Sequence, residues 1–398
     1  MLGESSTGVS AISWTAIFHT AGTQCPGGGG ELKERLAGVN QTAEFQAEQD
    51  WFTITHHNCA VKPQASVSCR RMIPCARIER QMLRRNMGAF SNLDLIAQVD
   101  SYPYEHDTTR YAEIGGSLYT LICGDGEGDV SLGYVLPEVV EKLAEAPASV
   151  RGEISIDTAK RTISAFQAPT LGARSKLAAD LFDFWRKRDA FPILRGWRDE
   201  LWPVYGRKGE LLIDMERSAS GLFGVMRYGV HLTAFVRCPS ASHDIKIWVP
   251  RRSPTKSTFP GMLDNTVAGG LMTGEDPFEC VIREADEEAN LPDQLVRSRT
   301  KHVGGVTYIY ITEAEAGQPK DGEVAEFHLC TVEEVQHSLA RGEWKPNCAL
   351  VMLEFFIRHG ILTKHNEPDY DHILRRIHRR LPFPGPHNQD PSLGAIDG

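Results

Sequence analysis

Residues 269–291 read GGLMTGEDPFECVIREADEEANL, and this stretch decides the fold of the C-terminal half of the chain. Asp276 is a good N-cap, because its carboxylate can accept hydrogen bonds from the free backbone N–H groups at the start of a helix. Pro277 suits the first helical position, where no N–H is needed. Asn290 tolerates the left-handed conformation that commonly ends a helix. The sequence therefore predicts a helix over residues 277–289, entered through a glycine-rich turn.

Three glutamates of this predicted helix, Glu284, Glu287 and Glu288, are spaced so that they share one face. In an ordinary helix, like charges at this spacing repel by roughly 0.2–0.5 kcal/mol per pair. A bound dication would turn that repulsion into binding, and carboxylate oxygens suit magnesium or manganese. The ordinary alternative is a solvated acidic face. We expect the three glutamates to bind Mg²⁺, with Mn²⁺ as the alternative ion.

Neighbouring residues favour the metal site over the solvated face. Arg283 stands beside the glutamates and can pair with one of their carboxylates, which would orient it. Gly269 and Gly270 let the backbone approach a bound ligand closely. Glu275 is placed to brace the turn between these glycines and the helix. We therefore expect Arg283 in the catalytic group, and Gly269, Gly270 and Glu275 in the part of the site that holds the substrate.

The same residues resemble the Nudix box in identity and spacing. One position departs from it, because Asn290 stands where the box has glycine. Asparagine tolerates the same backbone region, so the departure is a modest one. A match over so many positions, with its turn and helix in place, is far more specific than a lone glycine pattern. In chain order, the matched positions are Gly269, Glu275, Arg283, Glu284, the aliphatic Ala285, Glu287, Glu288 and the aliphatic Leu291.

The composition is that of an ordinary soluble protein of two or three domains. The chain has 398 residues, of which 41% are hydrophobic and 24% charged, and its net charge of −9 argues against a general nucleic-acid binder. No apolar run approaches the length of a membrane span, and the start of the chain lacks the basic region of a secretory signal. Nine cysteines at irregular spacing suit a reducing compartment. We expect a cytoplasmic protein without membrane contact, with organellar targeting as the alternative.

The pattern along the chain predicts an α+β protein in four parts. Residues 1–90 lack sustained periodicity and are predicted to be a poorly structured extension. Residues 91–220 alternate helix and strand patterns, which predicts a small α+β domain. Residues 221–380 place strands before and after the predicted helix and end in further helices, which predicts a second domain. The Pro- and Gly-rich residues 381–398 are expected to form a mobile tail.

Two features of the extension have ordinary explanations. Its histidines and cysteines could bind zinc, but their spacing fits none of the common zinc-finger patterns. The basic run over residues 70–85 could be an amphipathic helix, a targeting element or a solvated helix, and we favour the last. The residues considered as zinc ligands are His56, His57, Cys59, Cys69 and Cys75.

Segments outside the box, such as LWPVYG, FGVMRYGVHLTAFV and DGEVAEF, also resemble one Nudix family of fungi and plants. Its members pair an N-terminal domain of unknown function, DUF4743, with a C-terminal Nudix domain, and are often described as thiamine pyrophosphokinase-related. The resemblance covers about residues 92–384. It implies a Nudix fold, a mixed sheet sandwiched by helices, and magnesium-dependent hydrolysis of a diphosphate to the monophosphate. It further implies thiamine diphosphate and its oxidised analogues as substrates, with 8-oxo-dGDP as the alternative.

Hydrolysis of a diphosphate assigns roles to further residues. The site must neutralise the phosphate oxygens, orient a water molecule and remove its proton. Magnesium on the three glutamates would meet the first need, and one of those glutamates or the later Glu323 would act as base. Arg251, Arg252 and Lys256 precede the box and could meet the phosphates, although a solvated basic loop explains them equally well. His231 is expected to be structural.

One departure from the family concerns the segment after the box. A longer segment with an aromatic-rich strand precedes DGEV in the family, whereas here only TEAEAGQPK (residues 312–320) does. About one strand is therefore missing, so a degenerate Nudix domain that binds without hydrolysis is the alternative to an enzyme. Retention of every acidic box residue favours the enzyme, because a pure binder does not need three mutually repelling carboxylates. The expected partner is a small-molecule diphosphate, and the sequence does not set the oligomeric state.

Overall fold

The structure is a computed structural model that describes residues 89–386, apart from 101, 103, 105, 125–126, 303–306, 311–316 and 380–381. The predicted extension over residues 1–90 lies outside the described residues except at its last two positions. The zinc-ligand candidates and the basic run over residues 70–85 therefore lie outside them too, as does most of the predicted tail. Within the described part, no helix is long and apolar enough to cross a bilayer.

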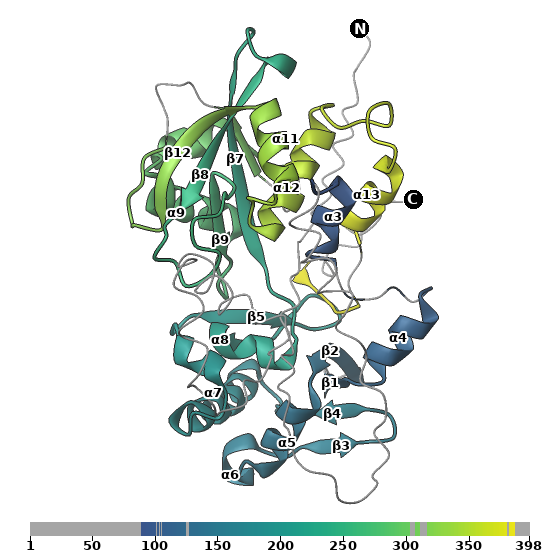
Figure 1. The fold of residues 1–398 in the computed structure, drawn as a ribbon. Coiled ribbons are helices and arrows are strands. Elements are labelled where there is room, and N and C mark those ends of the chain that lie inside the picture. Colours follow the sequence, from purple (N-terminus) through teal and green to yellow (C-terminus); the bar gives the residue numbers. More distant parts are fainter. Residues whose placement is uncertain are drawn as a thin grey trace, which may run out of the picture.

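The N-terminal unit carries a four-stranded sheet and a separate hairpin (Figure 1). Its elements are α4 (Thr108–Gly115), β1 (Tyr119–Gly124), β2 (Asp129–Val135), α5 (Pro137–Glu145), α6 (Ala148–Arg151), β3 (Ser155–Asp157), β4 (Thr162–Ser164), α7 (Leu171–Lys187), η2 (Pro192–Gly196), β5 (Leu201–Tyr205), β6 (Leu211–Glu216), α8 (Arg217–Ser220) and η3 (Gly221–Phe223). The sheet order is β2-β1-β4-β3, with β1 and β4 parallel and the other pairs antiparallel. β5 and β6 form the hairpin.

The C-terminal unit is built on a six-stranded mixed sheet (Figure 1). Its elements are α3 (Asn92–Ala97), β7 (Gly229–Arg237), η4 (Ser242–Asp244), β8 (Ile245–Arg252), β9 (Val267–Gly270), α9 (Pro277–Ala289), α10 (Asp293–Arg299), β10 (Thr300–His302), β11 (Thr307–Tyr310), β12 (Val324–Thr331), α11 (Val332–Ala340), α12 (Pro346–Arg358) and α13 (Tyr370–Ile377). The strand order is β10-β11-β7-β8-β12, and β9 also pairs with β7. Among these pairs, β7 and β11 are parallel.

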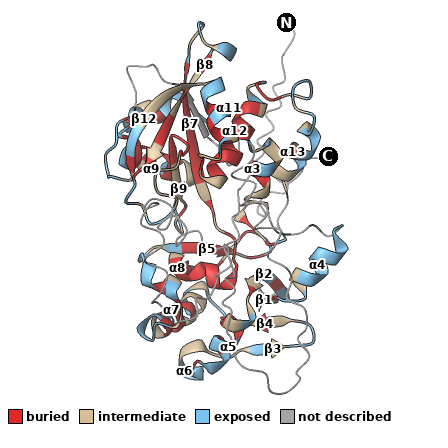
Figure 2. Cartoon of the chain, in the orientation of Figure 1, coloured by how far each residue is buried: buried red, intermediate tan, exposed pale blue. Residues whose placement is uncertain are grey.

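Helices cover both faces of this sheet, as Figures 1 and 2 show. Along β7, Leu232 and Ala234 pack with the apolar face of α9. Phe235 packs on the opposite face, against α12. Successive strand residues point to opposite faces, so this alternation buries β7 on both sides. The predicted mixed sheet sandwiched by helices, preceded by a smaller α+β region, is confirmed.

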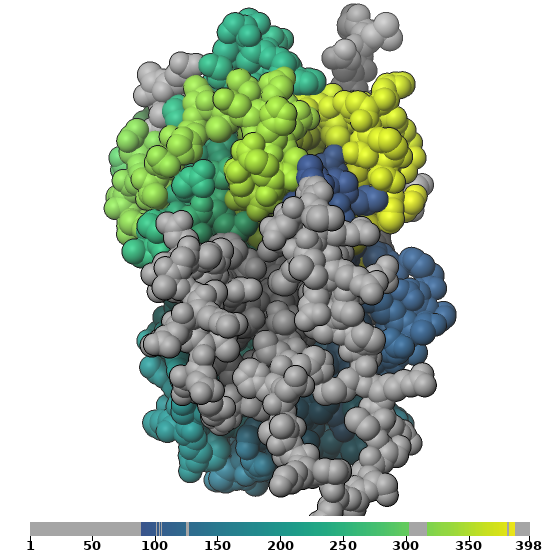
Figure 3. Space-filling model, viewed as in Figure 1, coloured from purple at the N-terminus to yellow at the C-terminus, as the bar shows by residue number. Residues whose placement is uncertain are grey.

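The first described helix, α3, belongs with the C-terminal unit rather than with the segment that follows it. Leu95 and Ile96 of α3 are buried in the same apolar cluster as α11 and α12. Just after α3, Asp100 pairs with Arg376 and Arg379, each at 2.7 Å. Figure 3 shows α3 and the C-terminal segment side by side on one face of the molecule. The chain therefore runs from the C-terminal unit into the N-terminal unit and back. The predicted first domain, residues 91–220, includes α3, although α3 packs in the C-terminal unit.

Several predicted ends and elements differ from the structure. The sequence NLDLIAQVDSY (residues 92–102) predicts one helix, but α3 ends at Ala97 and turn residues follow it. Asparagine favours the N-cap, so the sequence predicts that Asn347 caps α12. In the structure the cap position is Lys345, Pro346 is the first helical residue, and Asn347 is buried inside the helix. Proline favours the first helical position because its missing N–H would have no partner there. The elements that were not predicted include the strands β2, β5 and β9 and the helices α4, α6, α8 and α10.

Candidate active site

The helix α9 begins and ends as its sequence predicts. The Asp276 carboxylate accepts hydrogen bonds from the backbone N–H groups of Phe278 at 2.8 Å and Glu279 at 3.2 Å. Asn290 adopts the left-handed conformation with φ 50° and ψ 36°, and its N–H donates to the Asp286 carbonyl at 3.1 Å. The helix therefore runs over Pro277–Ala289, and the asparagine that departs from the box pattern supplies the conformation that glycine would.

The three box glutamates lie at three different depths. Glu288 is buried, and its Oε2 accepts a hydrogen bond from the backbone N–H of Ala268 on β9 at 2.9 Å. The Glu284 side chain is 14% exposed, and the Glu287 side chain is 48% exposed. The shared face predicted from their spacing thus runs from the sheet out to solvent.

Arg283 links the turn before the helix to two of the glutamates. Its Nε and Nη2 donate to the two carboxylate oxygens of Glu275 at 2.7 and 3.1 Å. Its Nη1 donates to Glu284 at 2.8 Å and to Glu287 at 3.0 Å. Burial raises the pKa of Glu275, but the hydrogen bonds from Arg283 and from the Met272 amide outweigh it and leave this pKa below its ordinary value. Arg283 therefore positions carboxylates in this structure, and Glu275 holds the turn.

The glycines of the turn permit close contacts from two sides. A Cβ on Gly269 would lie 2.1 Å from Cδ of Glu284, so a larger residue here would displace that glutamate. A Cβ on Gly270 would lie 3.0 Å from Cζ2 of Trp202, which belongs to the N-terminal unit. Gly274 has φ +79°, in the left-handed region that glycine adopts without strain. In this structure protein side chains, rather than a ligand, approach Gly269 and Gly270 closely.

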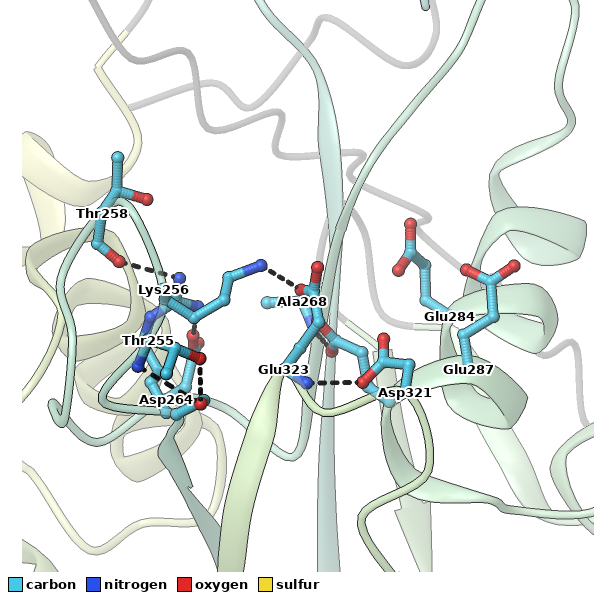
Figure 4. Close-up of polar contacts among 12 residues, drawn as sticks. Thr255, Lys256, Thr258, Asp264, Ala268, Glu284, Glu287, Asp321 and Glu323 are labelled. Atoms are coloured by element: carbon cyan, nitrogen blue, oxygen red, sulfur yellow. Dashed lines mark hydrogen bonds and ion pairs between the residues drawn. The ribbon is translucent and has the colours of Figure 1, made fainter. Parts of the chain in front are cut away.

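Lys256 and Glu323 meet beside the glutamate helix (Figure 4). Lys256 Nζ lies 2.5 Å from the Glu323 carboxylate, and the Glu323 N–H donates to Asp321 at 2.8 Å. Figure 4 shows Glu284 and Glu287 on α9 across from this pair. Arg251 has other partners, since its Nη1 donates to the Gly261 carbonyl at 2.8 Å and its Nε lies 3.5 Å from Glu326. Arg252 is buried and pairs with Asp264 at 2.8 Å, so it does not form the solvated basic loop or face a phosphate. Lys256 is therefore the best placed of the three predicted phosphate contacts.

Negative charge is crowded at the buried end of this group. Burial raises the pKa of Glu284, Arg283 lowers it, and the charges of Glu287 and Glu323 raise it again, so the net shift is upward. The pKa of Glu288 stands well above its ordinary value, first because of burial and then because of the charges of Asp264 and Glu284. Both carboxyl groups therefore gain from a nearby cation.

These residues fit a hard dication in donor chemistry. Carboxylates are the ligands that magnesium and manganese prefer, and the crowding of Glu284 and Glu288 is the electrostatic signature that such an ion would relieve. Among the described residues, however, no three acidic, histidine or cysteine side chains converge on one metal position. The reason is that Arg283 holds Glu284 and Glu287, while the Ala268 amide holds Glu288. For the three glutamates to hold an ion, their carboxylates would have to turn away from these partners.

A buried polar network lies behind Glu288. Asp264 accepts a hydrogen bond from Arg252 at 2.8 Å and from the Cys348 thiol at 2.6 Å, and Lys345 Nζ lies 3.5 Å from it. The neighbouring Asn265 lies 3.0 Å from Nδ1 of His231, whose pKa burial lowers to about 4. His231 therefore occupies a structural position, as expected. Sequence reasoning missed the network, because its members come from β7, β8, the segment before β9 and α12.

The N-terminal unit contacts the same turn directly. The backbone N–H of Thr273 donates to the Leu201 carbonyl of β5 at 2.9 Å. Beside it, Trp202 packs on Gly270, and the guanidinium carbons of Arg217 and Arg227 are each 5.2 Å from its ring centroid. No local pattern in the sequence predicts this contact. The box turn is thus held by both units.

Family models match both units of the chain. The NUDIX domain model matches residues 231–349, and the model for a domain of unknown function, DUF4743, matches residues 127–227. The solved structures similar to this chain include that of DR0079 from Deinococcus radiodurans, with 21% identity and a TM-score of 0.29 over 45% of this chain and all of that one.

Two curated relatives resemble the chain over longer stretches. The protein YJR142W of Saccharomyces cerevisiae is 32% identical over 75% of this chain and 94% of its own length. Nudix hydrolase 20, chloroplastic, of Arabidopsis thaliana is 31% identical over 52% of this chain, and the match spans 58% of that protein. With both domain models matched in this order, and a full-length relative above 30% identity, the chain belongs to the Nudix hydrolase family, with a DUF4743 domain preceding its Nudix domain.

Proposed function

We propose that this enzyme is a magnesium-dependent pyrophosphohydrolase that cleaves the diphosphate of a small organic or nucleoside diphosphate to the monophosphate. The observation that carries the proposal is the crowding of Glu284, Glu287 and Glu288 on one helix, with Glu284 and Glu288 largely buried. A protein gains nothing in stability from carboxylates whose pKa burial and like charges raise. Their retention is explained by a dication that they hold during the reaction.

Each residue of the site has a role in this proposal. Glu284, Glu287 and Glu288 would hold the ion, which neutralises phosphate oxygens and acidifies water when it is bound. The ion pair of Arg283 with Glu275 fixes the turn to the helix, and Arg283 also orients Glu284 and Glu287. The base is Glu323 or one of the three glutamates.

The residues at the rim of the site would contact the phosphates. Lys256 neutralises Glu323 in this structure and would turn to a phosphate oxygen when the substrate enters, with Arg251 as a second charge partner. Gly269 and Gly270 would present backbone to the substrate once Glu284 and Trp202, which fill the space of a Cβ at these glycines, move aside.

The substrate proposal rests on the family resemblance. We propose thiamine diphosphate and its oxidised analogues first, and 8-oxo-dGDP as the alternative. Competition between the two classes at equal concentration gives the ratio of their kcat/KM values. If 8-oxo-dGDP is preferred by about tenfold, equal to about 1.4 kcal/mol of transition-state binding, the thiamine proposal is wrong.

A binding protein with a degenerate Nudix domain is the second candidate. The short segment over residues 312–320 favours it, since less chain is present to shape a substrate pocket after β11. Such a protein would bind the diphosphate without releasing phosphate or monophosphate. We further propose a cytoplasmic location, with an organelle as the alternative, because the plant relative is named chloroplastic.

Substitution of the glutamates separates the two candidates. Glu287→Gln and Glu288→Gln keep the side-chain size but remove a charged ligand. The rate of diphosphate hydrolysis should fall by about 10² or more, about 3 kcal/mol of transition-state stabilisation. Magnesium should raise the Tm of the unmutated protein, because it binds the folded state, and should raise the Tm of each variant less.

A matched control makes this test specific. Asp286 lies on the same helix, is exposed, and pairs with Lys320. Asp286→Asn removes the same charge and should leave both the rate and the magnesium shift unchanged. If Glu287→Gln or Glu288→Gln behaves like this control, that glutamate does not belong to the proposed site.

A further inference from the structure

Arg227 lies in the short joint between the two units and has no role in the site as described so far. It is the last residue that the DUF4743 model matches, and β7 begins two residues later, at Gly229. In the joint, the backbone carbonyl of Tyr228 accepts a hydrogen bond from the Leu271 N–H of the box turn at 3.0 Å. Gly229 pairs with Gly270 in the sheet. The backbone therefore places Arg227 beside the box turn.

The Arg227 side chain lies over an aromatic ring that contacts the same turn. Its guanidinium carbon is 5.2 Å from the centroid of the Trp202 ring. Cζ2 of that ring would lie 3.0 Å from a Cβ on Gly270. Trp202 belongs to β5, which also reaches the turn through the hydrogen bond from Thr273 to the Leu201 carbonyl (Figure 1). One ring is thus next to both the guanidinium and the turn.

The guanidinium of Arg227 has more donors than the protein supplies acceptors. Its Nε donates to the Ser220 hydroxyl at 3.1 Å, and its Nη2 reaches the Arg217 carbonyl only at 3.5 Å. Among the described residues, Nη1 has no hydrogen-bond partner, and Arg227 forms no ion pair with a carboxylate. Arg227 is partly exposed, and Nη1 is not one of the unpartnered atoms that are sealed from solvent. A ligand can therefore reach this donor.

The positive charge of Arg227 also lacks compensation. Burial, and after it the charge of Arg217, lower the pKa of Arg227 to about 10. Arg217 has a carboxylate of its own, since it pairs with Glu200 at 2.8 Å. Stacking on Trp202 orients the guanidinium, but an aromatic face does not replace the counter-ion of a partly desolvated cation. An anion would supply both the missing charge and the missing acceptor.

We propose that Arg227 binds a phosphate oxygen of the substrate, so that the joint and the DUF4743 unit supply part of the substrate site. This inference rests on the proposed function, because it assigns the anion to the diphosphate of that substrate. A guanidinium suits the task, since its planar N–H groups match the oxygens of a phosphate. Lys256 would contact the diphosphate from the loop after β8, and Arg227 would add a contact from the N-terminal unit.

The test measures binding without hydrolysis. The full chain is titrated with sodium imidodiphosphate, in which a P–N–P link replaces the P–O–P anhydride, and binding is followed by calorimetry with and without magnesium chloride. Sodium malonate, which has two carboxylates, is the comparison at the same ionic strength. We expect saturable binding of imidodiphosphate that is at least about tenfold tighter than that of malonate, because phosphate groups carry more charge and more acceptor oxygens.

Variants locate this binding. Arg227→Gln should weaken imidodiphosphate binding by about tenfold or more, because it removes charge-assisted hydrogen bonds. Arg227→Lys should weaken it by about threefold, since lysine keeps the charge but cannot form paired hydrogen bonds. Arg186→Gln is the matched control. Arg186 also lies over a tryptophan, 4.6 Å from the Trp197 ring centroid, but it is exposed on α7, so its loss should leave binding unchanged.

A kinetic measurement separates this inference from the proposed function. Arg227→Gln should raise the KM for thiamine diphosphate by about tenfold, because a contact made equally in the ground state and the transition state acts on KM. If the unmutated protein binds imidodiphosphate through Arg227 but hydrolyses no diphosphate, the proposed function alone is wrong. If it hydrolyses a diphosphate and Arg227→Gln changes neither binding nor KM, this inference alone is wrong.

Several other outcomes would overturn the inference. One is a loss of binding in the Arg186 control as large as that in Arg227→Gln. Another is equal affinity for malonate, which would assign a carboxylate ligand to Arg227. Absence of imidodiphosphate binding to the unmutated chain, with and without magnesium, would mean that stacking on Trp202 is the whole role of Arg227. If Arg227→Gln does not fold, Arg227→Lys decides, and unchanged binding in that variant would refute the paired contact.

Discussion

Replacing Asp264 with asparagine tests whether the buried network behind Glu288 holds the C-terminal unit together. The Asp264 carboxylate accepts hydrogen bonds from Arg252 at 2.8 Å and from Cys348 at 2.6 Å, and it lies 3.5 Å from the Lys345 ammonium. Asparagine keeps the volume and removes the charge. Arg252 and Lys345 would then remain in the interior without their counter-ion.

The expected cost follows from the burial of the pair. The Arg252 and Asp264 side chains are each 8% exposed. Neutralising one partner of a buried pair costs about 3–5 kcal/mol, since the other charge stays desolvated. An exposed pair contributes about 0–1 kcal/mol. Glu326, 54% exposed and 3.5 Å from Arg251, provides the matched surface control as Glu326→Gln.

Urea denaturation at pH 7 measures the free energy of unfolding of both variants. Asp264→Asn should lose about 3–5 kcal/mol, and Glu326→Gln less than about 1 kcal/mol. The triple variant Asp264→Leu, Arg252→Met and Lys345→Met should recover part of the loss, because it removes all three charges. If Asp264→Asn falls within the range of the surface control, the network does not stabilise the fold in the way argued.

The same pair gives stability a dependence on pH. Burial raises the pKa of Asp264, but the charges of Lys345 and Arg252 and the Cys348 hydrogen bond lower it to about 2, from 3.8. A carboxyl whose folded pKa is depressed adds stability above its unfolded pKa and loses it as the pH falls through the folded pKa. The contribution is about 2 kcal/mol at 1.36 kcal/mol per unit. The difference in free energy of unfolding between the unmutated protein and Asp264→Asn should therefore decrease by about that amount as the pH falls from 4 to 2.

Three further predictions address the turn and the extension. Gly269→Ala should lower the free energy of unfolding by about 1–3 kcal/mol and lower the hydrolysis rate, because its Cβ would lie 2.1 Å from Cδ of Glu284. In thermal unfolding the control is Gly172→Ala, because a Cβ there meets nothing within 4 Å. Trp202→Ala should lower the free energy of unfolding by about 3–5 kcal/mol and lower the hydrolysis rate, whereas Trp202→Phe should keep most of the stability and most of the rate. An unchanged hydrolysis rate in a folded Trp202→Ala protein would contradict a role for the N-terminal unit at the turn. Removing residues 1–85 should leave the Tm and any hydrolysis unchanged, and an insoluble or inactive product would show that the extension is needed.

The box helix could be predicted to the residue because its determinants are local. Asp276 caps it, Pro277 starts it and Asn290 ends it, each through contacts within a few positions. The spacing of the glutamates likewise predicts their shared face. The spacing does not predict how deeply each one is buried. Glu288 is buried where α9 packs on the sheet, and the Ala268 amide of β9 donates a hydrogen bond to it there. Burial of that kind depends on tertiary packing, which spacing does not carry.

The missed strands carry residues that argue locally against a strand. β5 contains Pro203, which is tolerated because β5 pairs with β6 alone. β2 contains Gly133, where a Cβ would lie 2.3 Å from the carbonyl oxygen of Phe223. The glycine that weakens the strand pattern is therefore required by a partner ninety positions away. In both cases the reason for the residue lies in a contact that the local sequence does not show.

Contacts between the two units also hold the turn of the proposed active site. The box turn carries the left-handed Gly274 and the two glycines that Glu284 and Trp202 approach, so little of its shape comes from its own side chains. Its fixed points are Arg283 on one side and, on the other, β5, whose Leu201 carbonyl accepts the Thr273 N–H. The glycines give this turn a flexible backbone, and the N-terminal unit holds it in place. Loss of the N-terminal unit should therefore disturb the turn. Through the contacts at Gly270 and Thr273, the DUF4743 unit is a structural part of the proposed active site.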